Sequence, residues 1–147
     1  MGLFGKKRPK VDEGERCYIR ALDSFAIGDT GRALEYLNKS VELKNRHGMS
    51  RLARYYFENY PDDANKLLTA AQLMEQAEAA GAMVDNYDLG RLYDKLERPQ
   101  EAFQRYLAAA KSGEKESVFQ VAYRYAYGKG VERDYKEAAN WYEKAVE

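Results

Sequence analysis

The stretch FQVAYRYAYGKGVERDYKEAANWYEKAVE, residues 119–147, decides the fold, because it describes two helices joined by a glycine-bent loop. Small residues at Ala122 and Ala138 allow the two helices to approach closely. Gly128 can adopt the left-handed conformation that ends a helix, and Asp134 is placed to cap the second helix. A single helical hairpin cannot bury both of its faces, so this unit requires a neighbouring hairpin.

Weaker copies of the same unit precede this stretch. A small residue near the start of each second helix recurs at Ala33, Ala70, Ala102 and Ala138, in steps of 37, 32 and 36 residues. Strong helix formers dominate, and runs of alternating β-branched residues are missing. The sequence therefore predicts an all-α fold, an α–α superhelix (solenoid) of about four helical hairpins. The predicted repeat domain covers 12–147, with repeats at 12–46, 47–81, 82–113 and 114–147.

Residue periodicity and helix-ending residues predict where the individual helices lie. The predicted ranges are 12–27, 31–44, 48–58, 62–80, 84–95, 98–111, 115–127 and 134–147. If the hairpins are equivalent, Tyr106 and Trp141 on the second helices of the last two should occupy equivalent environments.

Composition indicates an ordinary water-exposed protein. Of 147 residues, 33% are charged and 45% hydrophobic, and the formal net charge is zero. The single cysteine, Cys17, excludes an internal disulfide framework and fits a reducing compartment. No apolar run approaches the ~20 residues of a membrane span. We therefore expect a soluble, cytoplasmic protein.

Residues 1–11 differ from the rest, because they hold four basic side chains and no acidic one. We expect this basic tail to be disordered. Its charge also suggests an alternative function, in which a regulatory or assembly subunit is tethered to a membrane surface or to nucleic acid. A stable membrane anchor usually needs two signals, so membrane and nucleic acid are not the partners that we expect.

The last hairpin closely resembles a known repeat. Residues 121–147 resemble the Sel1-like repeat, whose pattern is L-G-x-x-Y-x-x-G-x-G-V-x-x-D-x-x-K-A-x-x-W-Y-x-K-A-A-E. The direct matches are Tyr125, Gly128, Gly130, Val131, Asp134, Ala138, Trp141, Tyr142, Lys144, Ala145 and Glu147. Residues 89–113 are more similar to a tetratricopeptide repeat, because their link is shorter. The resemblance implies a right-handed superhelix that serves as an adaptor or scaffold and seldom carries chemistry.

The inventory of reactive side chains speaks against an enzyme. His47 is the only histidine and is expected in a loop or first helical turn, so no histidine-based metal cluster can form. Cys17 has no partner nearby in the sequence and is expected to be a small buried hydrophobe. No phosphate-binding loop is present. We predict no catalytic residue, no cofactor and no metal.

The first helices of stacked hairpins line the inside of the curve, as the resemblance implies. Tetratricopeptide geometry places eight residues in a peptide-binding groove there: Tyr18, Phe25, Arg54, Phe57, Tyr87, Arg91, Tyr123 and Tyr127. Aromatic and arginine side chains are enriched at binding hot spots. We predict that this groove binds an extended or helical peptide of another protein, with Arg54 and Arg91 contacting acidic groups. The alternative is that several of these aromatics belong to the core between repeats.

No polar capping helix follows the last repeat, although terminal repeats normally need an outer face that tolerates water. The aromatic side chains of that repeat include Tyr125, Tyr135, Trp141 and Tyr142. Either these side chains are satisfied inside the hairpin, or the exposed end pairs with a second copy or with further repeats. Self-association is therefore a second expected interaction.

Overall fold

The structure is a computed structural model that describes residue 5 and residues 11–147, so the predicted basic tail lies almost entirely outside the described residues. The described part is all-α, with eight helices and no strand. The helices are α1 Glu13–Ala26, α2 Thr30–Glu42, α3 Arg46–Asn59, α4 Ala64–Ala79, α5 Asn86–Lys95, α6 Pro99–Lys111, α7 Lys115–Tyr127 and α8 Tyr135–Ala145. All eight predicted helices are confirmed, and no boundary differs from its prediction by more than two residues.

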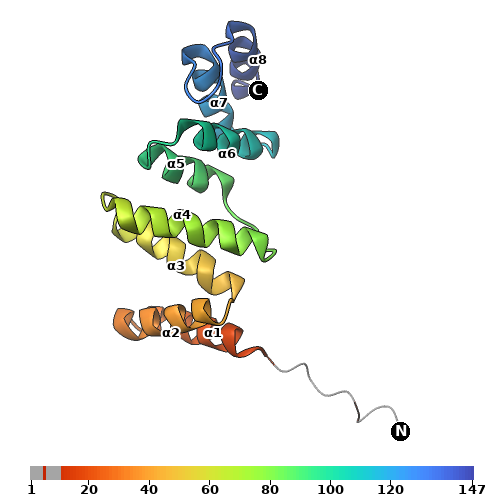
Figure 1. Ribbon diagram of the computed structural model, residues 1–147. Coiled ribbons are helices and arrows are strands. Elements are labelled where there is room, and N and C mark those ends of the chain that lie inside the picture. The colour runs from red at the N-terminus through yellow and green to blue at the C-terminus, as the bar shows by residue number, and fades with distance from the viewer. Residues whose placement is uncertain (1–4, 6–10) are drawn as a thin grey trace.

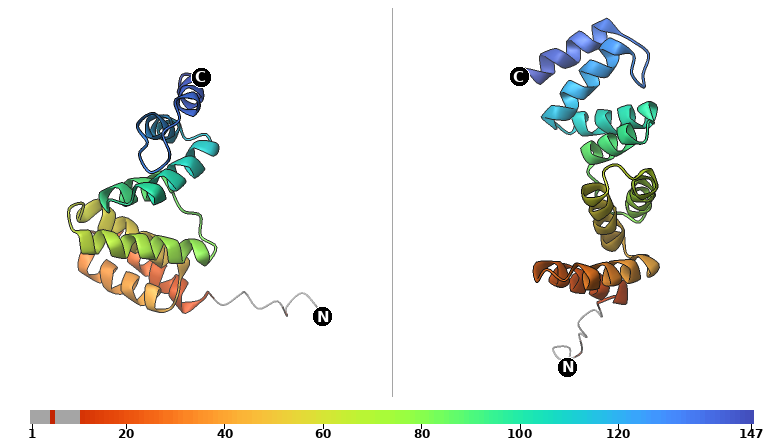
Figure 2. Two further views of the ribbon diagram at one scale, coloured as in Figure 1. Left: turned by 45° about the horizontal axis from the view of Figure 1, so that its top comes forward. Right: turned by 90° about the vertical axis from the view of Figure 1, so that its left-hand side faces the viewer.

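The helices form four hairpins, α1/α2, α3/α4, α5/α6 and α7/α8, stacked in one continuous array (Figure 1). Two further views show the same stack turning as it rises from the first hairpin to the last (Figure 2). The second and third hairpins contact each other less than the other neighbouring pairs do. Their connection, the segment 80–85, crosses from the end of α4 to the start of α5.

Helix starts follow from side-chain capping. Carboxylate or amide oxygens accept hydrogen bonds from the exposed amides of the first turn at seven helices, capped by Asp12, Asp29, Asn45, Asp63, Asp85, Glu114 and Asp134. The eighth helix, α6, has no side-chain cap and begins with Pro99. Proline lacks an N–H, but the first amides of a helix have no partner within the helix, so no hydrogen bond is lost there. The predicted cap Asp134 is thereby confirmed.

Five helices end in the same hydrogen-bonded turn, in which the residue after the cap adopts a left-handed conformation. Glycine occupies that position after α1, α4 and α6. Lys44 (φ 61°) and Glu97 (φ 57°) occupy it after α2 and α5, although left-handed backbone is unfavourable for residues with a side chain. In these two turns the closing backbone hydrogen bonds, from Asn45 N–H to the Ser40 carbonyl and from Arg98 N–H to the Tyr93 carbonyl, offset the conformational cost.

Small residues bring the two helices of a hairpin together around an aromatic ring. A Cβ atom at Gly90 of α5 would lie 2.8 Å from the Tyr106 ring on α6, so only glycine leaves room for that ring. Tyr106 is 2% exposed and packs against Tyr87, with ring centroids 5.9 Å apart. In the last hairpin the equivalent pair is Tyr142 and Phe119, 5.6 Å apart.

The expected equivalence of Tyr106 with Trp141 was therefore wrong by one position. The small residues near the start of the two second helices are Ala102 and Ala138. Counted from them, Trp141 corresponds to Arg105, and Tyr142 corresponds to Tyr106. Trp141 is buried at 9% exposure. A helix turns 100° per residue, so this offset of one position moves a side chain to a different face.

Three of the four aromatic side chains considered at the end of the array pack within the protein. Trp141 is buried, Tyr142 packs against α7, and Tyr125 packs edge-on against Phe103 of the preceding hairpin at 5.3 Å. Tyr135 is the exception among these four, at 67% exposure. These contacts favour the first of the two alternatives considered for this end of the array.

A buried ion pair joins the third and fourth hairpins. Arg124 of α7 is 1% exposed, and its Nη2 donates to both carboxylate oxygens of Asp94 on α5, at 2.7 and 2.6 Å. The Tyr106 hydroxyl also donates to Asp94, at 2.8 Å, and the Arg124 guanidinium lies 4.6 Å from the Tyr106 ring centroid. Burial and the hydrogen bond to Asp94 raise the pKa of Tyr106. The network keeps a charged group inside the stack, where it connects three helices.

Candidate functional site

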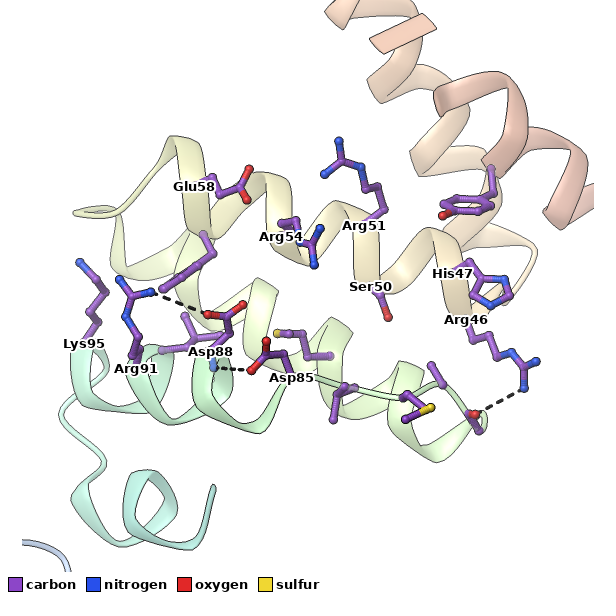
Figure 3. A pocket seen from close by; sticks show the side chains of 18 of the residues that line it. Arg46, His47, Ser50, Arg51, Arg54, Glu58, Asp85, Asp88, Arg91 and Lys95 are labelled. Atoms are coloured by element: carbon purple, nitrogen blue, oxygen red, sulfur yellow. Dashed lines mark hydrogen bonds and ion pairs between the residues drawn. The ribbon is translucent and has the colours of Figure 1, made fainter. Parts of the chain in front are cut away.

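A groove of about 960 Å³ lies between α3, α5 and the segment 81–85 that leads into α5. It occupies the junction between the second and third hairpins, which contact each other least. Figure 3 shows the side chains that line it. Met74 of α4 and Leu92 of α5 contribute apolar surface, and charged side chains surround it.

The α3 side of the groove is mainly cationic. Side chains from one face of α3 line the groove at a spacing of three or four residues. They include Arg46, His47, Ser50, Arg54 and Glu58. Figure 3 shows these side chains distributed along one length of α3.

His47 is held by the first hairpin. Its Nδ1 lies 3.0 Å from Glu15 Oε2, and its ring packs 5.5 Å from the Tyr18 ring. Asn45 donates to the same Glu15 oxygen at 2.9 Å. These two hydrogen bonds, His47 first, lower the pKa of Glu15. His47 lies in the first turn of α3, as predicted.

The α5 side carries both signs of charge. Asp85 caps α5 by accepting from the Asp88 amide at 3.1 Å. Arg91 Nη1 lies 3.7 Å from Asp88 Oδ1, so these two opposite charges pair with each other on α5. Burial, and then the nearby Asp85 carboxylate, raise the pKa of Asp88. Lys95 extends the α5 side and donates to the Pro61 carbonyl at 3.3 Å.

The groove has an excess of positive charge. Five of its lining side chains are arginine or lysine, and three are aspartate or glutamate. Within residues 11–147, only Arg91 of these five cations forms an ion pair. Arg46 and Lys95 donate to backbone carbonyls instead, and the Arg51 guanidinium lies 5.0 Å from the Phe25 ring centroid. An acidic ligand would supply the missing negative charge.

Of the eight residues assigned to the groove from the sequence, four line it: Tyr18, Arg54, Phe57 and Arg91. The other four lie elsewhere: Phe25, Tyr87, Tyr123 and Tyr127. Phe25 packs against Tyr55 at 6.0 Å, and Tyr87 packs against Tyr106, so both serve contacts between helices.

Tyr123 and Tyr127 lie one turn apart on α7, with ring centroids 4.7 Å apart. They are 37% and 69% exposed, and they lie on the hairpin beyond the groove.

Sequence reasoning missed several lining residues. Arg46, Ser50 and Arg51 share the α3 face with Arg54, so the helical spacing could have found them. Asp85 and Asp88 were missed because a residue at a helix start is first interpreted as a cap, which Asp85 also is.

Two further observations bear on the nature of the site. Among the residues that the structure describes, no three His, Cys, Asp or Glu side chains lie close enough together to hold a metal ion. No helix within 11–147 has the length and apolar character needed to cross a membrane.

Comparisons with known proteins agree with the architecture. Residues 14–45 and 115–147 each match the Sel1 repeat. Among curated proteins there is no significant match. Among solved structures, the chain is similar to the crystal structure of a protective antigen present in uropathogenic Escherichia coli strains, described as displaying an SLR fold. The TM-score is 0.66 at 26% identity, over 90% of this chain and 30% of that chain.

Proposed function

We propose that this Sel1-repeat solenoid is a non-enzymatic scaffold or adaptor that holds an acidic segment of a partner protein in the groove between α3 and α5. Solenoid repeats typically present extended concave surfaces to other proteins. The observation that carries the proposal is the groove's excess of cationic side chains, four of which have no ion pair among the described residues.

The composition of the groove suits protein recognition. Arg54 and Arg91 supply directional hydrogen bonds, and Phe57 supplies an aromatic contact beside them. The Arg91 guanidinium lies 5.3 Å from the Phe57 ring centroid, so the ring helps to hold the cation in place. Arginine and aromatic residues dominate the energetics of most interfaces.

The two side chains best suited to catalysis, His47 and Cys17, are both engaged in the fold, which supports a binding role and not a chemical one. His47, the histidine of the groove, is engaged by Glu15 and stacks on Tyr18, which leaves it as a link between hairpins. Cys17 is 1% exposed in the core, so its thiol has no access to a substrate.

The proposal is tested with a fluorescein-labelled glutamate-rich peptide and fluorescence anisotropy. Changing Arg54→Gln and Arg91→Gln together should weaken binding by about five- to thirtyfold, because hot-spot losses are about 1–2 kcal/mol. Raising the salt concentration should weaken binding of the wild type as well.

The matched control is Arg32→Gln on α2, since Arg32 is exposed and lies outside the groove. Circular dichroism should show unchanged helix content in both variants. Equal peptide affinity in the double variant and the wild type, or equally tight binding of a lysine-rich peptide, would reject the proposal.

A further inference from the structure

An arginine of the third hairpin reaches back to the second. Arg105 of α6 donates to both carboxylate oxygens of Glu78 on α4, at 2.7 and 3.0 Å, and to Asn86 Oδ1 on α5, at 3.1 Å. The Arg105 side chain is 22% exposed and the Glu78 side chain 41%, so water reaches the contact. We call Glu78, Asn86 and Arg105 the polar joint.

The other two junctions hold apolar side chains where the polar joint stands. The positions are counted from the recurring small residue of each second helix and from the buried residue Leu52, Leu89 or Val121 of each first helix. The equivalent triplets are Val41, Met49 and Leu73 between the first and second hairpins, and Ala110, Val118 and Trp141 between the third and fourth. All six belong to the hydrophobic core or pack against it. Two junctions are therefore closed by burial at these positions, and the middle one by an ion pair.

The chain that connects the second and third hairpins is also the longest of its kind. Segments 43–45 and 112–114 join the other neighbouring hairpins, whereas 80–85 joins these two. In the described structure, the N–H groups of Met83, Val84 and Asp85 donate to no backbone carbonyl, and Met83 is 99% exposed. A segment with so few contacts can change its backbone angles at little cost.

The remaining side-chain hydrogen bonds across this junction are polar contacts near the surface. The Tyr93 hydroxyl donates to Glu75 of α4, and Lys95 donates to the Pro61 carbonyl at 3.3 Å. Among the helices, α4 and α5 make the main contact between these hairpins, and it is weaker than the helix contacts at the other two junctions. The two hairpins therefore meet along one narrow line, with the polar joint beside it.

We propose that this junction is a hinge, in which residues 11–79 and 86–147 rotate relative to each other about the α4/α5 contact and the polar joint holds the closed arrangement. A partly exposed ion pair exchanges with water at little net cost, which a buried apolar triplet cannot do. Rotation of this kind is absorbed by a few residues at the end of an element, here 80–85.

The hinge bears on the groove without depending on what the groove holds. The same two hairpins form the groove, so rotation at the joint changes the separation of α3 and α5. None of the three residues of the polar joint lines the groove, so the joint can be altered while the groove side chains stay unchanged.

The hinge is tested by double electron–electron resonance on the protein without any ligand. Spin labels at Glu35→Cys on α2 and Gln104→Cys on α6 place one probe in each half, at exposed and equivalent helix positions. Cys17 is 1% exposed and stays unlabelled. High salt weakens a partly exposed ion pair, so it should increase the open population of the wild type.

Two variants move the hinge in opposite directions. Arg105→Gln removes the ion pair and should raise the ratio of open to closed molecules about two- to fivefold. The triple variant Glu78→Val, Asn86→Met and Arg105→Leu installs the apolar triplet of the first junction. It should give one narrow distance distribution that salt does not change. The matched control is Arg98→Gln, which removes an α6 arginine whose partner, Glu101, lies on the same helix at 3.6 Å.

The outcomes are distinct. Distance distributions that are identical in the wild type, Arg105→Gln and the triple variant would overturn the proposal, and so would an equal change in Arg98→Gln. Circular dichroism checks the helix content of each variant. If Arg105→Gln loses helix, the salt series on the wild type decides alone, and a distribution that salt leaves unchanged overturns the hinge.

Discussion

Replacing Asp94 with asparagine should test whether the buried ion pair sets the stability of the junction between the third and fourth hairpins. Asp94→Asn keeps the size of the side chain and an oxygen that can accept from Tyr106. It leaves the Arg124 guanidinium, which is 1% exposed, without a countercharge. The guanidinium also has two nitrogens, Nε and Nη1, without a hydrogen-bond partner in the described structure.

Leaving a buried charge unpaired costs about 3–5 kcal/mol. The Asp94 side chain is 27% exposed, which allows some water to reach the guanidinium, so we expect a loss near 3 kcal/mol. For a chain of this length, that loss lowers Tm by about 6–12 °C.

Urea denaturation followed by circular dichroism measures the effect, and the double variant Arg124→Met with Asp94→Asn is the control. Methionine removes the unpaired charge, so the double variant should be more stable than Asp94→Asn alone. A loss below about 1 kcal/mol in Asp94→Asn, or no recovery in the double variant, would refute this view of the pair.

Three further predictions concern backbone and pH. Lys44→Gly should raise the free energy of unfolding by about 1 kcal/mol because it relieves left-handed strain, whereas Gly113→Ala, at φ 93°, should lower it; thermal melts compare the two. Gly130→Ala should lower the free energy of unfolding by about 2 kcal/mol or more, because a Cβ there would overlap the Pro99 carbonyl; an unchanged urea midpoint would contradict this contact. The pKa of Glu15 is lowered in the folded state. The contribution of the Glu15 carboxylate to the free energy of unfolding is therefore complete above pH 4.5, its ordinary pKa, and is lost as the pH falls through and below that value. Glu15→Gln should therefore destabilise the protein at neutral pH and flatten the acid limb of a stability–pH profile.

The helices could be predicted from the sequence because local signals mark both their faces and their ends. Carboxylates stand at helix starts, and glycines follow the ends of α1, α4 and α6. Lys44 and Glu97 show where local signals stop, because neither residue favours the left-handed conformation that it adopts. The backbone hydrogen bonds that close these turns form whatever the side chain, so the residue type gives no sign of them.

The groove could be predicted only in part for a similar reason. A helical repeat indicates which face of a first helix is open, and this logic found Arg54 and Arg91. It could not show that Tyr87 is held against Tyr106, since that contact depends on a glycine in α5 and on the partner helix. Arg124 was missed entirely, because its carboxylate partner lies 30 residues earlier in the chain.

The groove spans two hairpins, α3/α4 and α5/α6, at the junction where neighbouring units touch least. An occupant that contacts both sides therefore contributes to the coupling between the lower and upper halves of the stack. If the groove is occupied as proposed, we expect binding and the cooperativity of unfolding to be linked, with the unbound array losing its halves in separate steps and the occupied array melting as a single unit.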